Sequence, residues 1–197
     1  MEYPEIWKST TYIPSGVTYA EGELLYTLSQ TAHRSKSGSV MEIGSYLGKS
    51  AIIMASTGLV VCIDHHRGNS EHQIGQPRCR PGTVVNGQVN TFPLFKQNLE
   101  KAGVWQNVNP VITDHLTAIS TLDTSLFPVA VLFVDAEHSY ETTCSIISNW
   151  RERVEGHILF HDCNNDFPEV SQAIRDSGLG TPVIQVDSIW GFEFKKK

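Results

Sequence analysis

Two apolar segments late in the chain, 129–134 and 157–160, are each followed at once by titratable residues. These residues are Asp135, Glu137, His138, His161 and Asp162. If the segments are neighbouring strands, their ends bring the five side chains into one small volume. Packing carboxylates together costs free energy unless a cation or a shared proton offsets their repulsion. The cluster therefore predicts a functional site.

The cluster allows two interpretations. In the first, Asp135, His161 and Asp162 hold a divalent metal ion through carboxylate oxygens and one imidazole nitrogen. Glu137 or His138 is then free to act as a general base. In the second, no metal is bound, and the side chains form a hydrogen-bonded network at the strand ends in which His138 and Asp162 are partners.

A second candidate site lies earlier, where the apolar run 40–43 ends in a turn with two glycines, Gly44 and Gly48. Glycines let a backbone approach a ligand closely, and the helix expected after them would turn free N–H groups toward that ligand. Asp64 follows the next apolar run, where a carboxylate can accept hydrogen bonds from both hydroxyls of an adenosine ribose. The pattern predicts a nucleoside-type ligand, and a tight turn with a capping residue is the alternative.

The elements that must position these residues alternate between helical and strand patterns. Helices are expected at 19–34, 50–57, 91–102, 139–153 and 168–177, with a short one opening at Asp114; strands are expected at 40–43, 59–63, 108–113, 129–134, 157–160, 183–186 and 189–194. Continuously apolar strands separated by helices indicate a parallel sheet covered on both faces. Only two residues separate the last two strands, which fits a tight antiparallel hairpin. We therefore predict a doubly wound α/β fold with an antiparallel edge.

One domain is expected over residues 1–197, with an N-terminal extension at 1–18. After the second strand, residues 65–90 lack a helix or strand pattern and form a long loop. Its basic side chains are His65, His66, Arg67, His72, Arg78 and Arg80. The loop is either a lid or acceptor clamp, whose arginines read a phosphate or a carboxylate, or a solvated insertion.

The composition argues against several classes of protein. Fifteen Lys and Arg against 21 Asp and Glu give a formal charge of −6, which disfavours a nucleic-acid partner and a polybasic membrane surface. No apolar stretch is long enough for a transmembrane helix, and no signal peptide is visible. The four cysteines are widely spaced and form no CxxC pair, so we expect reduced thiols and a cytoplasmic protein.

Together these residues resemble the class I S-adenosylmethionine-dependent methyltransferases. The stretch Val40-Met41-Glu42-Ile43-Gly44-Ser45-Tyr46-Leu47-Gly48-Lys49-Ser50-Ala51 looks like the first motif of the catechol O-methyltransferase group. The wider pattern is closer to the family called methyltransferase domain 24, which is related to macrocin-type O-methyltransferases and cephalosporin hydroxylase-like proteins. Its further matching segments are Ile63-Asp64-His65-His66-Arg67-Gly68 with Glu71-His72, Phe133-Val134-Asp135-Ala136-Glu137-His138-Ser139-Tyr140-Glu141, Phe160-His161-Asp162 and Ser188-Ile189-Trp190.

The resemblance implies a Rossmann-like, doubly wound seven-stranded sheet, mostly parallel with an antiparallel C-terminal strand and helices on both faces. It also implies S-adenosylmethionine as the cofactor. The residues that it assigns to the cofactor are Glu42, Gly44, Ser45, Tyr46, Gly48 and Ser50 around the methionine half, Asp64 on the ribose, His115 at the adenine, and Asp135 beside the sulfonium. Metal-dependent relatives carry an acidic pair or Asp-Asn where this chain has His161-Asp162, and an imidazole lowers the preference of a site for Mg²⁺.

We therefore expect a methyltransferase that acts on a hydroxyl of a small molecule of the sugar or natural-product type. An alcohol or phenol must lose its proton, and the residues expected to take part in catalysis are His138, Glu137 and Asp135. Mg²⁺ or another divalent metal, held by Asp135, His161 and Asp162, is a second candidate cofactor. Two alternatives are a metal-dependent hydroxylase-like or hydrolytic enzyme on the same fold and a non-catalytic cofactor-binding protein. The sequence is compatible with a homo-oligomer.

Overall fold

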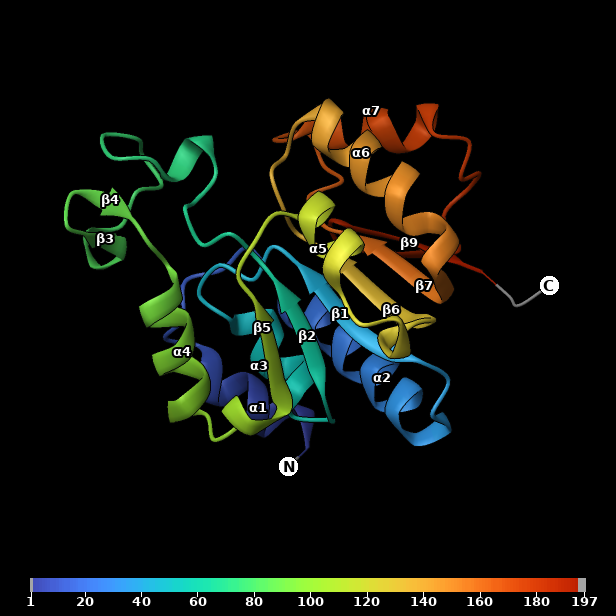
Figure 1. Ribbon diagram of the computed structural model, residues 1–197, viewed down its shortest axis with the longest axis horizontal. Helices are drawn as coiled ribbons and strands as arrows, with labels where there is room; N and C mark the ends of the chain where they lie inside the picture. Colours follow the sequence, from blue (N-terminus) through green and yellow to red (C-terminus); the bar gives the residue numbers. More distant parts are fainter. Residues whose placement is uncertain (1, 195–197) are drawn as a thin grey trace.

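The computed structural model describes residues 2–194 and contains a seven-stranded sheet in the order β5-β2-β1-β6-β7-β9-β8 (Figure 1). The strands are β1 (Ser39–Ile43), β2 (Val60–Ile63), β5 (Val108–Val111), β6 (Val129–Val134), β7 (Val154–Phe160), β8 (Ile184–Val186) and β9 (Ile189–Glu193). All pairs from β5 to β7 are parallel, whereas β9 lies between β7 and β8 and is antiparallel to both. This confirms the predicted fold and the terminal hairpin.

The register of the central strands explains how the site forms. Ile43 at the end of β1 pairs with Ile63 of β2 and with Val134 of β6, and Val134 pairs with Phe160 of β7. These strands are apolar and buried at their carboxyl ends, so they stay in the centre of the sheet. The residues that follow the four strands therefore emerge side by side along one edge of the sheet.

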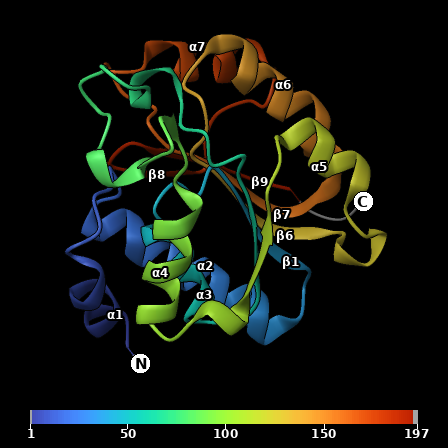
Figure 2. The same cartoon turned by 60° about the vertical axis from the view of Figure 1, so that its left-hand side comes forward.

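Helices cover both faces of the sheet (Figures 1 and 2). On one face lie α1 (Tyr3–Thr10), α2 (Tyr19–Ser35), α3 (Lys49–Ala55) and α4 (Phe92–Lys101); on the other lie α5 (His115–Thr121), α6 (Tyr140–Trp150) and α7 (Pro168–Asp176). Each face has its own apolar core, with Phe95 fully buried in the first and Trp150 in the second. Short 3₁₀ turns are η3 (Trp105–Asn107), η4 (Thr124–Leu126) and η5 (Arg151–Arg153). No helix among residues 2–194 is long and apolar enough to cross a membrane.

Residues 2–18 contain a packed helix and are more than an extension. Helix α1 was not predicted, but it packs against α2 and α3, with Tyr3 and Ile6 buried. The Tyr3 hydroxyl donates a hydrogen bond to the carbonyl of Tyr19, 2.6 Å away. The helix is short and offers only a few apolar contacts, which is why its periodicity is hard to recognise in the sequence.

The segment 65–90 contains local structure, so the expectation of a featureless loop was wrong. It holds the turns η1 (Ser70–His72) and η2 (Pro81–Thr83) and a small hairpin of β3 (Val84–Val85) and β4 (Gln88–Val89). Its base is fixed by His66, which is buried and whose Nδ1 lies 2.8 Å from the Thr91 hydroxyl. The segment leaves the carboxyl end of β2 and extends over the edge of the sheet at which the candidate residues emerge (Figure 1).

Candidate functional site

A large cavity of about 890 Å³ opens at the carboxyl ends of the strands. Its wall contains the residues that follow β1, β2, β5, β6 and β7, together with parts of the segment 65–90 and the connection between α1 and α2. That volume is in the range that holds a drug-sized ligand. The cavity contains both predicted sites, so the glycine turn and the acidic cluster face one shared space.

The two glycines of the turn after β1 are required by packing. Gly44 and Gly48 have φ of 91° and 88°, a region that favours glycine. A side chain at Gly44 would collide with the backbone carbonyl of Asp135, and one at Gly48 would collide with the Leu99 side chain. The absent side chains thus let the turn pack against the β6 end and against α4, and close approach of a ligand to the two glycines stays a prediction.

Asp64 organises that turn. One oxygen of its carboxylate accepts hydrogen bonds from the backbone N–H groups of Ser45 and Tyr46, each at 2.8 Å. The other oxygen accepts one from His66 at 2.6 Å. The side chain is 13% exposed and lies on the cavity wall. Asp64 therefore joins the ends of β1 and β2 and still presents carboxylate oxygens, which keep spare acceptor capacity, to a ligand.

His115 lies on the same wall, in the first turn of α5. Asp114 caps this helix by accepting hydrogen bonds from the N–H groups of Leu116 and Thr117. Burial lowers the pKa of His115, which favours its neutral form. Its Nδ1 is buried and has no hydrogen-bond partner within residues 2–194. A neutral ring with an unused polar atom suits contact with a flat heterocycle.

Glu42 lies behind the wall, where it is fully buried and outside the set of residues that line the cavity. Burial raises its pKa to about 7, against hydrogen bonding from Ser50 and Ser45, and the charges of Asp135 and Asp64 raise it further. Glu42 is thus separated from the cavity by the residues that line it. Ser45, Tyr46, Gly48 and Ser50, which were predicted with it, do line the cavity.

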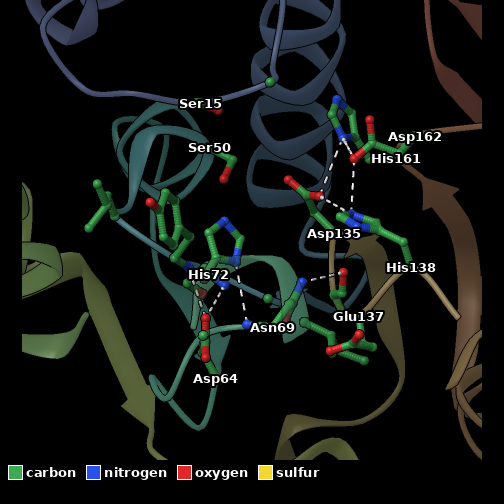
Figure 3. Close-up of a pocket in the computed structure, with 18 of the residues that line it drawn as sticks. Ser15, Ser50, Asp64, Asn69, His72, Asp135, Glu137, His138, His161 and Asp162 are labelled. Carbon is green, nitrogen blue, oxygen red and sulfur yellow. Dashed lines mark hydrogen bonds and ion pairs between the residues drawn. The ribbon is translucent and has the colours of Figure 1, made fainter. Parts of the chain in front are cut away.

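The predicted cluster of acids and histidines forms on the other side of the cavity (Figure 3). The Nδ1 of His161 lies 3.3 Å from the Asp135 Oδ1 and 3.1 Å from the Asp162 Oδ2. The Nε2 of His138 lies 3.0 Å from the same Asp162 oxygen and 3.8 Å from Asp135. The chain therefore brings together four of the five residues singled out at these strand ends.

Glu137, the fifth, points away from this cluster. Its carboxylate accepts a hydrogen bond from the Ser70 hydroxyl at 3.0 Å, so it joins the loop after β6 to the segment 65–90. It still lines the cavity. The position of His138 beside Asp135 and Asp162 favours His138 over Glu137 as the group that exchanges a proton with a ligand.

Sequence reasoning missed the part played by Glu21. It completes a capping box at the start of α2, where it accepts a hydrogen bond from the Thr18 N–H at 2.8 Å. The same fully buried carboxylate lies 3.2 Å from the His161 Nε2 and accepts hydrogen bonds from the N–H and hydroxyl of Ser188 at 2.8 and 2.6 Å. No local signal links residue 21 to residue 161, because only the folded sheet places them together.

Further residues surround the cluster, and nothing in the sequence indicated their place there. Glu71 approaches the second nitrogen of His138, at 3.1 Å, and the Phe167 ring lies on the imidazole with centroids 3.9 Å apart. His72 stacks on Tyr46 at 4.7 Å. These residues lie on loops, and the sequences of the loops do not predict how they run over the cavity.

Opposite charges set the protonation of the cluster. Burial works against a charged imidazole at His138, but Asp135 and Asp162 outweigh it and raise its pKa to about 9. Likewise, burial opposes the charge on Asp135, yet the facing imidazoles of His161 and His138 lower its pKa to about 2. The pKa of Asp162 is lowered and that of His161 raised for the same reasons. Without a metal ion, the histidines therefore carry the positive charge that the carboxylates need.

The same residues fit a divalent cation. One ligand atom from each of Asp135, His161 and Asp162 lies within 4.8 Å of the others. Within residues 2–194, the His161 Nδ1 makes no hydrogen bond of good geometry, although both carboxylates are near it. Glu21 faces the other ring nitrogen, as the outer partner of a metal-bound histidine commonly does. The metal site thus has support in the geometry. His138 and Asp162 are close partners, as the second interpretation predicts, but within residues 2–194 neither nitrogen of His138 makes a hydrogen bond of good geometry.

Comparison with known proteins places this geometry in context. The profile of a family described as "Methyltransferase domain" matches residues 41–163. Among solved structures, the O-methyltransferase NovP has a TM-score of 0.68 at 13% identity and covers 92% of this chain and 82% of its own. TomG from Streptomyces achromogenes, an O-methyltransferase of tomaymycin synthesis in complex with S-adenosylmethionine, has a TM-score of 0.60 at 17% identity, over 97% and 86%. CalS11, a TDP-rhamnose 3′-O-methyltransferase, has 0.61 at 14%, over 98% and 94%. At such identities these structures are similar in fold.

Proposed function

The chain belongs to the methyltransferase domain family, and we propose that it transfers the methyl group of S-adenosylmethionine to a hydroxyl oxygen of a small molecule. The observation that carries this proposal is the shared cavity. One side of it offers a backbone turn held by Asp64, and the other offers a proton-exchanging histidine in an acidic cluster. A methyl donor and a hydroxyl acceptor need these two environments next to each other.

The cofactor half of the cavity is proposed to hold S-adenosylmethionine as the resemblance implies. Asp64 would receive the ribose hydroxyls, and His115 would lie against the adenine, where its unused Nδ1 supports the assignment. Gly44, Ser45, Tyr46, Gly48 and Ser50 would surround the methionine half, with Glu42 beneath them. Asp135, which ends the neighbouring strand, would approach the sulfonium from the acceptor side.

The chemistry asked of the chain itself is modest, because the bound cofactor supplies an activated methyl group. The chain must exclude water, align the acceptor oxygen with the methyl group and remove a proton. We assign proton removal to His138, oriented by Asp135 and Asp162, with Glu137 as the less well placed candidate. A base must be neutral, so the raised pKa of His138 has to fall when the acceptor and cofactor occupy the site.

A divalent cation would be held by Asp135, His161 and Asp162, with Glu21 fixing the His161 ring. When bound, it would neutralise the carboxylates and lower the pKa of an acceptor hydroxyl. This part of the proposal is separable from cofactor binding, since the turn held by Asp64 does not depend on the cation.

The acceptor class is supported by the names of the structural relatives. NovP and TomG are O-methyltransferases, the latter in tomaymycin synthesis, and CalS11 acts on TDP-rhamnose. We propose a sugar or natural-product hydroxyl as the acceptor and a single catalytic domain over residues 1–197. A cytoplasmic location agrees with the four free cysteines. A homo-oligomer stays a prediction, which sedimentation would measure.

The direct experiment incubates the protein with S-adenosylmethionine carrying a trideuterated methyl group and a panel of sugars, phenols and their conjugates. We expect a labelled ether product and stoichiometric S-adenosylhomocysteine, detected by mass spectrometry. Label on nitrogen would contradict the proposed acceptor atom. Tight cofactor binding without turnover on any acceptor would instead support the non-catalytic alternative.

A further inference from the structure

Two arginines of the segment 65–90 line the mouth of the cavity, and the mechanism above does not use them. Arg78 and Arg80 are exposed and lie on the cavity wall, whereas Arg67 of the same segment does not. Within residues 2–194, neither Arg78 nor Arg80 forms an ion pair with a carboxylate. Arg78 lies near the Glu71 carboxylate and Arg80 lies near the Tyr46 hydroxyl, but neither guanidinium is held in a close ion pair with a described residue, so both can bind an anionic ligand.

Arg78 lies on the acceptor side of the opening. Its guanidinium carbon is 4.9 Å from the centre of the Phe167 ring, and that ring packs on the His138 imidazole at 3.9 Å between centroids. The Phe167 ring therefore contacts both the guanidinium and the proposed base, so Arg78 lies at the end of the cavity where the acceptor oxygen is proposed to bind.

Arg80 lies beside the glycine turn on the opposite side. Burial raises the pKa of the Tyr46 hydroxyl, and the Arg80 guanidinium beside it opposes that shift. Residues 78–80 therefore extend across the opening of the cavity. The Arg78 guanidinium lies near Phe167 on one side, and the Arg80 guanidinium lies near Tyr46 on the other.

Deeper in the cavity, the carboxylates of Asp135 and Asp162 face the imidazoles of His138 and His161, so these charges balance one another. The guanidinium groups of Arg78 and Arg80 therefore attract an anionic group to the mouth, and a neutral hydroxyl on the same molecule is left to reach His138.

From these contacts we propose that the acceptor is an anion: a hydroxylated molecule whose phosphate or carboxylate is bound by Arg78 and Arg80. The inference rests on the proposed function, because it describes the acceptor of that reaction. Guanidinium groups form bidentate hydrogen bonds with both kinds of anion, so the arginines alone do not distinguish phosphate from carboxylate.

The test measures three ring-bearing probes that differ in charge: phenyl phosphate, benzoate and neutral benzyl alcohol. Each is titrated by calorimetry into protein saturated with S-adenosylhomocysteine, so that the cofactor's own carboxylate is already in place. EDTA removes divalent cations, which keeps the probes from binding through a metal. The proteins compared are the wild type, Arg78→Gln, Arg80→Gln, the double variant and Arg67→Gln, each checked for an unchanged Tm.

We expect at least one anionic probe to bind the wild type about tenfold or more tightly than benzyl alcohol. The double variant should lose that preference, and Arg67→Gln should keep it. A preference for phenyl phosphate alone identifies a phosphate on the acceptor, and an equal preference for benzoate admits a carboxylate. Equal affinities for all three probes, no measurable binding of either anion, or a preference that survives in the double variant would each overturn the inference. Failure to saturate the protein with S-adenosylhomocysteine would instead count against the proposed function.

Discussion

The two halves of the cavity are built in different ways. In the cofactor half, Asp64 is bound by three backbone N–H groups, all within nineteen residues of it. In the acceptor half, side chains from distant parts of the chain face one another, and Glu21 and His161 are 140 residues apart. The first half is fixed by the turn itself, and the second depends on the whole sheet, on opposite charges and on the packing of α2.

This difference predicts that each half can be damaged without the other. Hydrogen bonds to backbone groups stabilise the turn whether or not an acceptor is present. The charges of the acceptor cluster are balanced only while its members remain together, so that removal of one alters the others.

The largest effect is expected from His138→Gln. The amide has similar bulk but cannot act as a base at neutral pH, so turnover on the acceptor should fall about 10²- to 10⁴-fold. The affinity for S-adenosylhomocysteine should stay within about twofold, because the cofactor half keeps its own hydrogen bonds. Steady-state kinetics and calorimetry on the same protein check both values. A loss of cofactor affinity equal to the loss of turnover would show that the halves are not separable.

Asp64→Ala is the reciprocal change. It removes a carboxylate that serves both the turn and the proposed ribose contact, so the affinity for S-adenosylhomocysteine should fall about 10- to 100-fold. Asp123→Ala is the matched control, because Asp123 also accepts a backbone N–H, from Ser125, but lies outside the cavity. Calorimetry with both variants isolates the cofactor contact. Equal affinities for the two variants would remove Asp64 from the cofactor site.

Glu42→Gln tests whether the halves share one electrostatic environment, since both Asp64 and Asp135 raise the pKa of Glu42. The folded protein has this pKa at about 7, above its ordinary value of 4.5. The stabilising contribution of Glu42 is therefore present below pH 4.5 and is lost as the pH rises through 7.

Relative to the wild type, Glu42→Gln should thus gain about 2 kcal/mol in the free energy of unfolding between about pH 5 and pH 8.5. Urea denaturation at the two pH values measures this gain. A difference between the proteins that does not change with pH would show that Glu42 titrates normally.

The smallest effect is expected from Asn69→Ala. The Asn69 amide donates a hydrogen bond to the carbonyl of Ala136 at 3.2 Å and so ties the segment 65–90 to the acceptor half. Its loss should cost about 1 kcal/mol of local stability, seen as roughly fivefold faster hydrogen exchange in that segment. Asn149→Ala, which removes a hydrogen bond to the Ser145 carbonyl on α6, should leave that exchange unchanged.

The same contrast explains what the sequence could predict. The glycine turn, Asp64 and the residues that end β6 and β7 were found, because each is marked by its position directly after an apolar strand. Because these strands pair in parallel, their register brings the residues that follow them close together. Most residues of the cofactor half could therefore be predicted from local sequence patterns.

What the sequence could not supply depends on contacts across long separations. Glu21 looked like an ordinary capping residue, and its second bond, to His161, arises only when α2 packs across β1 and β6. Glu71 and Phe167 lie in loops whose direction is set by neighbours. Glu42 carried the right motif, but its depth behind the cavity wall follows from its place in a strand whose other buried residues are Val40, Met41 and Ile43.

The central claim is that the turn held by Asp64 forms a cofactor site, and calorimetric titration of S-adenosylmethionine into the wild-type protein tests it most directly. The titration is run with and without Mg²⁺. We predict one site of micromolar affinity in both conditions, because the cofactor half does not need the acidic cluster. No heat of binding at millimolar ligand, in a sample shown to be folded, would contradict the claim.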